Sequence, residues 1–225
     1  MFRCAVIGTV CLLAASALAR SAGDSAAPSS PAPKPVVAME EPRPGDFWTY
    51  EIRDEITGKI SSIRTFVVTE VTPTEISVSV HIEGKDNVGL NVYDRSWNLT
   101  SAPPWKYQPN NGEGIVSPLK VGASRSFEGH NVNAETGNVW KRSGRSSVTG
   151  QETITTKAGT FDTFKIERSA SLRPTNDPTR KQEITVQTWY APAIDHWVRR
   201  TFVSRMNAHL VVNETSELVD YGRKK

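Results

Sequence analysis

The side chains that could carry out acid-base or nucleophilic chemistry are scattered along this sequence. The histidines, His81, His130, His196 and His209, lack the short spacings of a metal site, such as His-x-His or His-Glu-x-x-His. Asp195 and His196 precede a strand-like run and could supply two members of a Ser-His-Asp triad, but no Gly-x-Ser-x-Gly elbow is present. Gly58-Lys59 lacks the upstream glycine and the following Ser or Thr of a phosphate loop. The sequence therefore assigns no catalytic residue, no metal ligand and no cofactor.

Paired carboxylates are the remaining route to acid-base catalysis. The candidates are Glu51, Asp54, Glu55, Asp162, Glu167 and Glu183. Most of them stand beside lysine or arginine on an alternating polar face, where surface charge is the ordinary explanation. A secreted hydrolase that acts on cell-wall glycan through convergent carboxylates stays open as the alternative function.

Aromatic residues between positions 84 and 118 are the best candidates for contact with a ligand. Trp105 and Tyr107 lie in Pro103-Pro-Trp-Lys-Tyr-Gln-Pro109, where the prolines disfavour a central strand and stiffen the chain. Trp97 and Tyr93 belong to the same long connection. These rings either bind a ligand or fold back on the core. Tryptophans in strand-like runs are expected to be core residues: Trp48, Trp189 and Trp197.

The elements that position these residues are strands, because period-two alternation recurs along the chain. Between Ile76 and Ile82, apolar residues alternate with Ser and His, which predicts a strand with one buried face. Similar runs span residues 47–53, 63–71, 139–148, 152–156, 163–172, 183–190, 197–204 and 210–219. Hairpin-type turn residues separate them, and no window shows a sustained helical stripe. The predicted fold is mainly β: a single curved antiparallel sheet, or a half-open barrel or β-sandwich, with few short helices.

The N-terminal region has the composition of an exported chain. Arg3, the apolar run that follows it and Ala17-Leu-Ala19 predict a signal peptide at 1–19, cleaved after Ala19. An Ala/Ser/Pro-rich disordered leader is expected at 20–43, an antiparallel β domain at 44–221 and a basic tail at 222–225. Both cysteines, Cys4 and Cys11, fall in the signal peptide. We therefore expect a periplasmic or secreted mature chain without a disulfide or a membrane span.

The charge balance argues against a nucleic-acid partner. Lysine and arginine number 27 against 24 acidic residues, a formal net charge of +3. Removal of Arg3 with the signal peptide leaves 26 against 24, or +2. Such a balance produces no extended positive field for a phosphate backbone.

Three segments in the C-terminal half carry a family resemblance. They are Pro118-Leu-Lys-Val-Gly-Ala-Ser-Arg-Ser-Phe-Glu128, Thr156-Lys-Ala-Gly-Thr-Phe-Asp-Thr-Phe-Lys-Ile-Glu167 and Thr188-Trp-Tyr-Ala-Pro-Ala-Ile-Asp-His-Trp-Val-Arg-Arg200. In this order they resemble a group of uncharacterised secreted or periplasmic bacterial β-domain proteins. The resemblance implies a curved antiparallel sheet, half-closed as in bacterial lipoprotein-carrier domains, and it implies no catalytic residue.

These observations favour a non-enzymatic envelope protein. Its expected partner is an apolar ligand, such as a lipid or acyl chain, or an envelope protein for which it is a scaffold. A glycan hydrolase and a purely structural β module remain the rival interpretations.

Overall fold

The computed structural model describes residues 39–223, except residues 87 and 178. The predicted signal peptide and most of the predicted leader lie outside the described residues, as do both cysteines. Met39 is fully buried, and its backbone N–H donates a hydrogen bond of 2.7 Å to the carbonyl of Ala193. This residue of the predicted leader is therefore packed into the folded domain.

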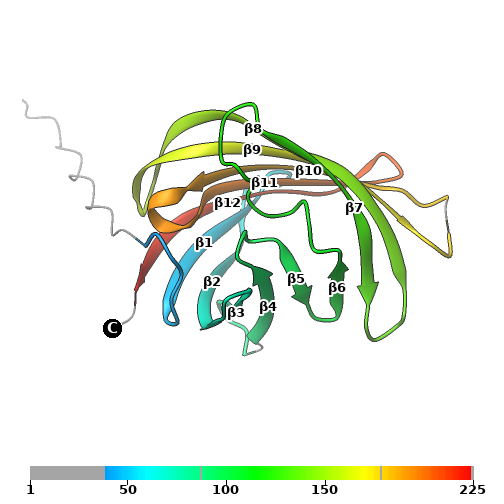
Figure 1. The fold of residues 1–225 in the computed structure, drawn as a ribbon, viewed down its shortest axis with the longest axis horizontal. Coiled ribbons are helices and arrows are strands. Elements are labelled where there is room, and N and C mark those ends of the chain that lie inside the picture. The colour runs from blue at the N-terminus through cyan, green and yellow to red at the C-terminus, as the bar shows by residue number, and fades with distance from the viewer. Residues whose placement is uncertain (1–38, 87, 178, 224–225) are drawn as a thin grey trace, which may run out of the picture. The chain divides into compact units, whose positions relative to one another are not determined.

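Twelve antiparallel strands form one closed barrel (Figure 1). Each strand pairs with its neighbours along the chain, and the first strand pairs with the last. The strands are β1 (Asp46–Asp54), β2 (Ile60–Val71), β3 (Glu75–Ile82), β4 (Val88–Asp94), β5 (Leu99–Ala102), β6 (Trp105–Gln108), β7 (Ser124–Asn133), β8 (Val139–Thr156), β9 (Gly159–Pro174), β10 (Gln182–Ala191), β11 (His196–Met206) and β12 (His209–Arg223). Within the described chain the one helical element is the 3-10 turn η1 (Pro192–Ile194). None of the described helical structure is long and apolar enough to cross a membrane.

The prediction of a mainly β fold is confirmed, but the predicted curved sheet, half-open barrel or β-sandwich is wrong. The sheet closes because β1 and β12 pair from Asp46↔Arg223 to Asp54↔Glu214. Closure gives hydrogen-bond partners to both strands that would otherwise be edges of the sheet. The interior is therefore an enclosed space rather than an open concave face.

The strands differ from the sequence prediction in three places, one of which is β7, a strand that was not among the predicted runs. Residues 139–148 and 152–156, predicted as separate strands, belong to the continuous β8. Its register shifts between Val148 and Gly150, and a bulge of this kind interrupts the alternation that sequence reading relies on. Residues 84–118, predicted as long irregular connections around one or two short strands, contain three strands, β4 to β6.

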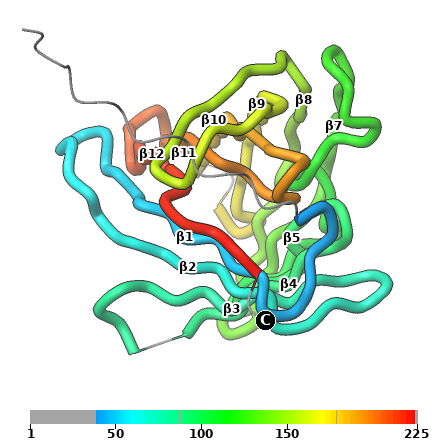
Figure 2. The backbone as a smooth tube through the Cα atoms, turned by 90° about the vertical axis from the view of Figure 1, so that its left-hand side faces the viewer, coloured from blue at the N-terminus to red at the C-terminus, as the bar shows by residue number. Residues whose placement is uncertain are grey.

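An ion pair links the first and last strands. Asp46 is fully buried, and its carboxylate accepts hydrogen bonds from Arg223 Nε at 2.7 Å and Nη2 at 2.9 Å. The backbone N–H of Arg43 donates to the same carboxylate at 2.8 Å. Arg223, placed by the sequence prediction in a basic tail, is therefore the last residue of β12. The start of the described chain and its C-terminal strand lie side by side at one end of the barrel (Figure 2).

Candidate ligand-binding cavity

The barrel encloses a cavity of about 530 Å³. This volume falls within the usual range of small-molecule pockets, about 300 to 1,000 Å³. Its walls are built from alternate residues, because successive side chains of a strand point to opposite faces. The contributions of β9 and β10 show this spacing: Ile166, Arg168, Ala170 and Leu172 from β9, and Gln182, Ile184, Val186 and Thr188 from β10.

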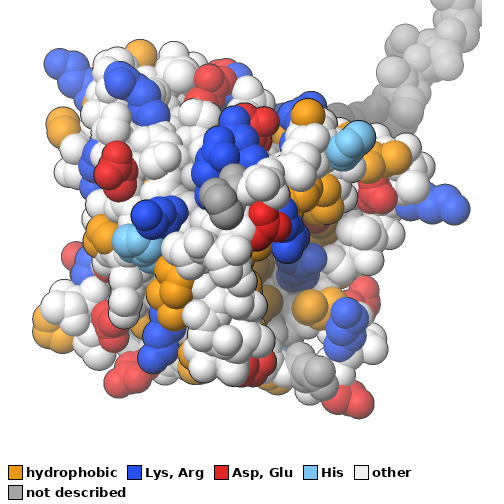
Figure 3. Space-filling view, turned by 90° about the vertical axis from the view of Figure 1, so that its right-hand side faces the viewer, with side chains coloured by type: hydrophobic (Ala, Val, Ile, Leu, Met, Phe, Trp, Pro, Cys, Tyr) orange, Lys and Arg blue, Asp and Glu red, His pale blue; other side chains and the backbone are white. Residues whose placement is uncertain are grey.

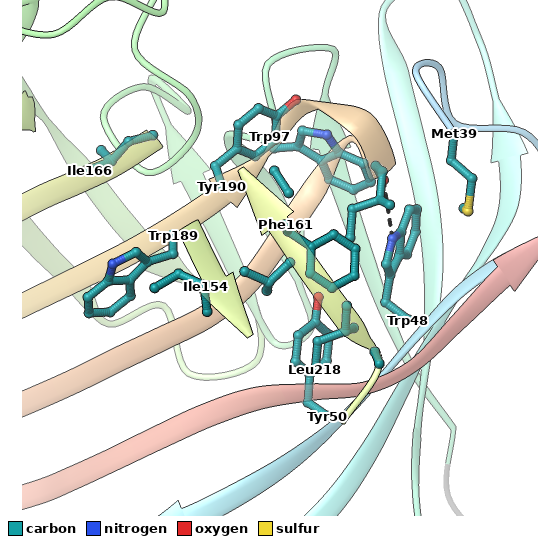
Figure 4. Close-up of a cluster of buried hydrophobic side chains, with 14 of the residues drawn as sticks. Met39, Trp48, Tyr50, Trp97, Ile154, Phe161, Ile166, Trp189, Tyr190 and Leu218 are labelled. Carbon is teal, nitrogen blue, oxygen red and sulfur yellow. Dashed lines mark hydrogen bonds between the residues drawn. The ribbon is translucent and has the colours of Figure 1, made fainter. Parts of the chain in front are cut away.

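Aromatic side chains close the end of the barrel at which the described chain begins. Trp48 is fully buried and stacks on the His196 ring at 4.2 Å, and His196 stacks on Trp197 at 3.7 Å. Trp97 meets Trp48 edge to face at 5.8 Å. The indole N–H of Trp48 donates to the carbonyl of Ile194 (Figure 4). This packing seals one end of the cavity with apolar surface.

A tyrosine and a histidine share a buried hydrogen bond within this seal. The Tyr50 hydroxyl donates to the carbonyl of Trp197 at 2.8 Å, and its oxygen lies 2.5 Å from His196 Nδ1. Because the hydroxyl has one proton and a carbonyl can only accept, His196 carries its proton on Nδ1 and donates to Tyr50. Burial lowers the pKa of His196 well below its ordinary value, so the ring is neutral.

Asp195 and His196 do not form the triad considered from the sequence. The Asp195 carboxylate accepts a hydrogen bond from the Tyr190 hydroxyl, while His196 Nδ1 faces Tyr50, where a triad would have its carboxylate. Burial raises the pKa of Asp195 to about 6. Among the described residues, no three His, Cys, Asp or Glu side chains gather as a metal site would require.

The cavity extends toward the opposite end of the barrel. Its lining includes Trp140, the second residue of β8, and Gln182, the first residue of β10. Figure 3 looks onto this end and shows hydrophobic and basic side chains in a recess. Apolar residues are also exposed here: Ile56 in the turn after β1 is 62% exposed, and Val211 in β12 is 57% exposed. This end is the mouth of the cavity.

Three arginines with buried polar atoms stand on the cavity wall. The Arg142 side chain is 2% exposed and the Arg168 side chain 9%, and Arg200 is half-buried on β11. Glu113 lies between two of them, with Oε1 at 3.1 Å from Arg142 Nη1 and Oε2 at 3.6 Å from Arg168 Nη1. Burial lowers the pKa of Arg142 and of Arg200, and the positive charge of Arg168 lowers both further. A guanidinium nevertheless stays charged in a protein, so the wall is positive.

All four aromatic residues predicted to contact a ligand line this cavity: Trp105, Tyr107, Trp97 and Tyr93. Trp105 and Tyr107 lie on β6, which pairs with both β5 and β7, rather than in an irregular loop. The Arg142 guanidinium stands over the Tyr107 ring at 5.6 Å. Trp97 and Tyr93 are also part of the aromatic seal, with ring centroids 5.4 Å apart.

Sequence reasoning missed the arginines and Glu113. Arg168 has the same strand parity as Ile166 and Ala170, and Arg200 has the same parity as Phe202. A charged residue that strand alternation places on the same face as apolar residues was the signal that could have identified these arginines. Glu113 had no such signal, because it belongs to an irregular segment between β6 and β7.

The three segments that carried the family resemblance overlap a sequence match. Residues 125–200 match the DUF3108-like family model. This match confirms the predicted resemblance to an uncharacterised β-domain family. No curated protein matches the sequence.

Solved structures resemble a larger part of the chain. A provisionally assigned lipoprotein of Parabacteroides distasonis ATCC 8503 has a TM-score of 0.55 at 14% identity, over 82% of this chain and 99% of that one. YmcC of Escherichia coli K12, a hypothetical lipoprotein, has a TM-score of 0.48 at 11% identity, over 79% of this chain and 86% of that one. A provisionally assigned exported protein with a YmcC-like fold from Bacteroides fragilis NCTC 9343 has a TM-score of 0.40 at 14% identity, over 83% of this chain and 100% of that one. The first likeness shows a shared fold.

Proposed function

We propose that this chain is a non-enzymatic envelope protein that binds an apolar or amphiphilic ligand inside its barrel. The observation that carries the proposal is the cavity of about 530 Å³, which has aromatic and aliphatic walls and is sealed at one end. A concave, mostly apolar site with a few polar groups is the usual form of a ligand pocket. The exposed apolar side chains at the mouth give an apolar ligand a favourable surface to contact on entry.

Two further observations support an envelope location and a binding role. The similar structures are described as lipoproteins or an exported protein, in keeping with the predicted periplasmic or secreted localisation. None of the six carboxylates proposed for glycan hydrolysis lines the barrel cavity, and Glu51 is paired with Lys157 at 2.7 Å. The cavity lining does include Glu113 and Glu214, but Glu113 is paired with Arg142 and Arg168, and this pairing favours binding over hydrolysis.

The experiment measures binding of the neutral fluorescent probe N-phenyl-1-naphthylamine to the purified full chain. We expect saturable binding by the wild type and its loss in Ala170→Trp, because Ala170 lines the cavity and an indole there occupies ligand space. Ser169→Trp is the matched control, since Ser169 is the preceding residue and is exposed. Native mass spectrometry of protein purified without detergent then asks which molecule is carried from the cell.

Comparison of probe binding by the wild type and by Ala170→Trp decides whether the site lies inside the barrel. Equal probe binding by wild type and by a folded Ala170→Trp variant would place the site outside the barrel and refute the proposal. Circular dichroism and thermal unfolding establish that each variant is folded before binding is compared.

A further inference from the structure

Positive charge on the cavity wall exceeds negative charge. The lining contains Arg64, Arg142, Arg168 and Arg200 against Glu113 and Glu214, which is four positive charges to two negative, or +2. Charged groups in a low-dielectric interior are costly unless opposite charges and hydrogen bonds compensate them. An anion inside this barrel is therefore favoured over a neutral or cationic molecule of the same shape.

The arginines also keep donors that no atom of the described residues satisfies. Arg168 Nε and Nη1 and Arg200 Nε are buried and have no hydrogen-bond partner among the described residues. Thr188 on β10 pairs with Ile166 of β9 on one side and with Arg200 of β11 on the other. Arg168 lies two residues after Ile166, so the two guanidinium groups belong to neighbouring parts of one wall. Most buried donors in proteins are paired, and these donors line a cavity large enough for a ligand.

Glu113 shows what kind of group this wall accommodates. Its two carboxylate oxygens are divided between Arg142 and Arg168, at 3.1 and 3.6 Å. The Arg142 guanidinium also donates to the carbonyl of Pro109 at 2.5 Å, so Arg142 is largely occupied by protein groups. Arg142 keeps only its Nε without a hydrogen-bond partner among the described residues, so most of the donors available for an oxyanion are those of Arg168 and Arg200. Arginine is well suited to bind a group with several acceptor oxygens, because its planar fork donates in parallel.

Apolar side chains flank these donors on the same wall. Ile166, Val186 and Phe202 line the cavity beside the two arginines. A methylene group occupies about as much space as a water molecule, roughly 30 Å³, so the cavity has room for a chain of about a dozen carbons with its head group. The wall therefore combines a place for a charged head with a place for a tail.

We propose that the cavity binds an amphiphile with a single acidic head group, a carboxylate or a phosphate, held by Arg168 and Arg200, with its alkyl tail against the apolar wall. This inference rests on the proposed binding function and adds the chemistry of the ligand. Both head groups offer the shared feature that the arginines recognise, an oxyanion with at least two acceptor oxygens.

The test is displacement of N-phenyl-1-naphthylamine by three molecules with the same twelve-carbon tail: dodecanoate, dodecyl phosphate and dodecanol. We expect at least one of the anions to compete about tenfold or more better than dodecanol, because charge-assisted hydrogen bonds to a buried guanidinium are strong. Competition by the carboxylate alone or by the phosphate alone identifies the head group, and competition by both supports the shared chemistry.

Variants test the residues. Arg200→Met keeps much of the side-chain volume and removes the charge, and it should lower the preference for the anions over dodecanol, measured on the same variant, about tenfold or more. Arg205→Met is the matched control, because Arg205 lies on the same strand and is exposed. If Arg200→Met does not fold, Arg168→Met is the second variant, with the same expected result.

Each outcome bears on a different proposal. Probe binding with equal competition by dodecanol and both anions would overturn the acidic-head inference and leave the binding function intact. Equal loss of anion binding in Arg200→Met and Arg205→Met would also overturn it, since a general charge effect would then explain the selectivity. Absence of probe binding by the wild type would refute the binding function itself, and this inference with it.

Discussion

Replacing Asp195 by asparagine should make the protein more stable at neutral pH and more sensitive to acid. Asp195 follows η1 and has a left-handed backbone, with φ of 47°, a conformation that asparagine tolerates well. The amide oxygen can still accept the hydrogen bond that the Tyr190 hydroxyl donates to the carboxylate. The substitution therefore removes the charge and keeps the shape.

The magnitude follows from the pKa of Asp195, which burial raises from its ordinary 3.8 to about 6. A folded state with the higher pKa binds the proton first, so the stability from this group is fully present below about pH 4 and is lost as pH rises through about 6. This rise in the pKa of Asp195, from 3.8 to about 6, corresponds to about 3 kcal/mol of unfolding free energy. Asparagine behaves as the protonated acid at every pH. The variant should exceed the wild type by about 3 kcal/mol near pH 8 and match it near pH 4.

The neighbouring His196 has the opposite effect on the pH dependence of stability. Burial lowers the pKa of His196, so the unfolded chain takes up a proton below about pH 6.5 while the folded protein does not, and stability falls as pH falls. In the wild type the two slopes oppose each other between about pH 6 and 4. In Asp195→Asn no carboxylate at position 195 opposes the effect of His196, so the free energy of unfolding should fall by up to about 1.4 kcal/mol per pH unit as pH falls.

The assay is urea unfolding of wild type and Asp195→Asn, followed by tryptophan fluorescence at several pH values from about 8 to 4. Asp220→Asn is the control, because Asp220 is exposed and its replacement changes the net charge by the same amount. A stability difference between variant and wild type that stays constant with pH, or that grows toward acid, would refute the reasoning.

Two further substitutions test the packing. Gly144→Ala should destabilise the barrel by about 1–3 kcal/mol, because a Cβ there would lie 2.2 Å from the Ser169 carbonyl oxygen. Gly150→Ala on the same strand has no atom within 4 Å of its Cβ, so equal urea midpoints for the two variants would contradict this prediction. Tyr50→Phe should cost about 1–3 kcal/mol, because it leaves the Nδ1 donor of His196 without its acceptor, and an unchanged melting temperature would count against the buried hydrogen bond.

The strands could be predicted because one face of the sheet is buried and the other is exposed to solvent, which gives an alternating sequence pattern. Residues 76–82 alternate as predicted and form most of β3. Closure could not be predicted, since it depends on the pairing of β1 with β12 across the whole domain, and alternation within a strand carries no information about its neighbour. The bounds of the short strands β5 and β6 could not be predicted, because four residues are too few to show a period.

The candidate site could be predicted only in its aromatic part. Trp105 and Tyr107 were recognisable from their residue type and proline-rich setting, and both line the cavity. Arg142 and Arg168 resemble surface charges in the sequence, because barrel curvature and closure are what turn their strand face into an interior wall. Which polar residues face inward is thus a property of the closed barrel rather than of any single strand.

The contact between the first and last strands determines when the barrel can close during synthesis and folding. Asp46 and Arg223 are 177 positions apart, and native pairings over such long separations form slowly. Until β12 is in place, β1 and β11 each have an unpaired edge that can join another chain. A shorter, still-emerging piece has no enclosed interior, so the twelve-strand domain is the smallest unit that can enclose a ligand.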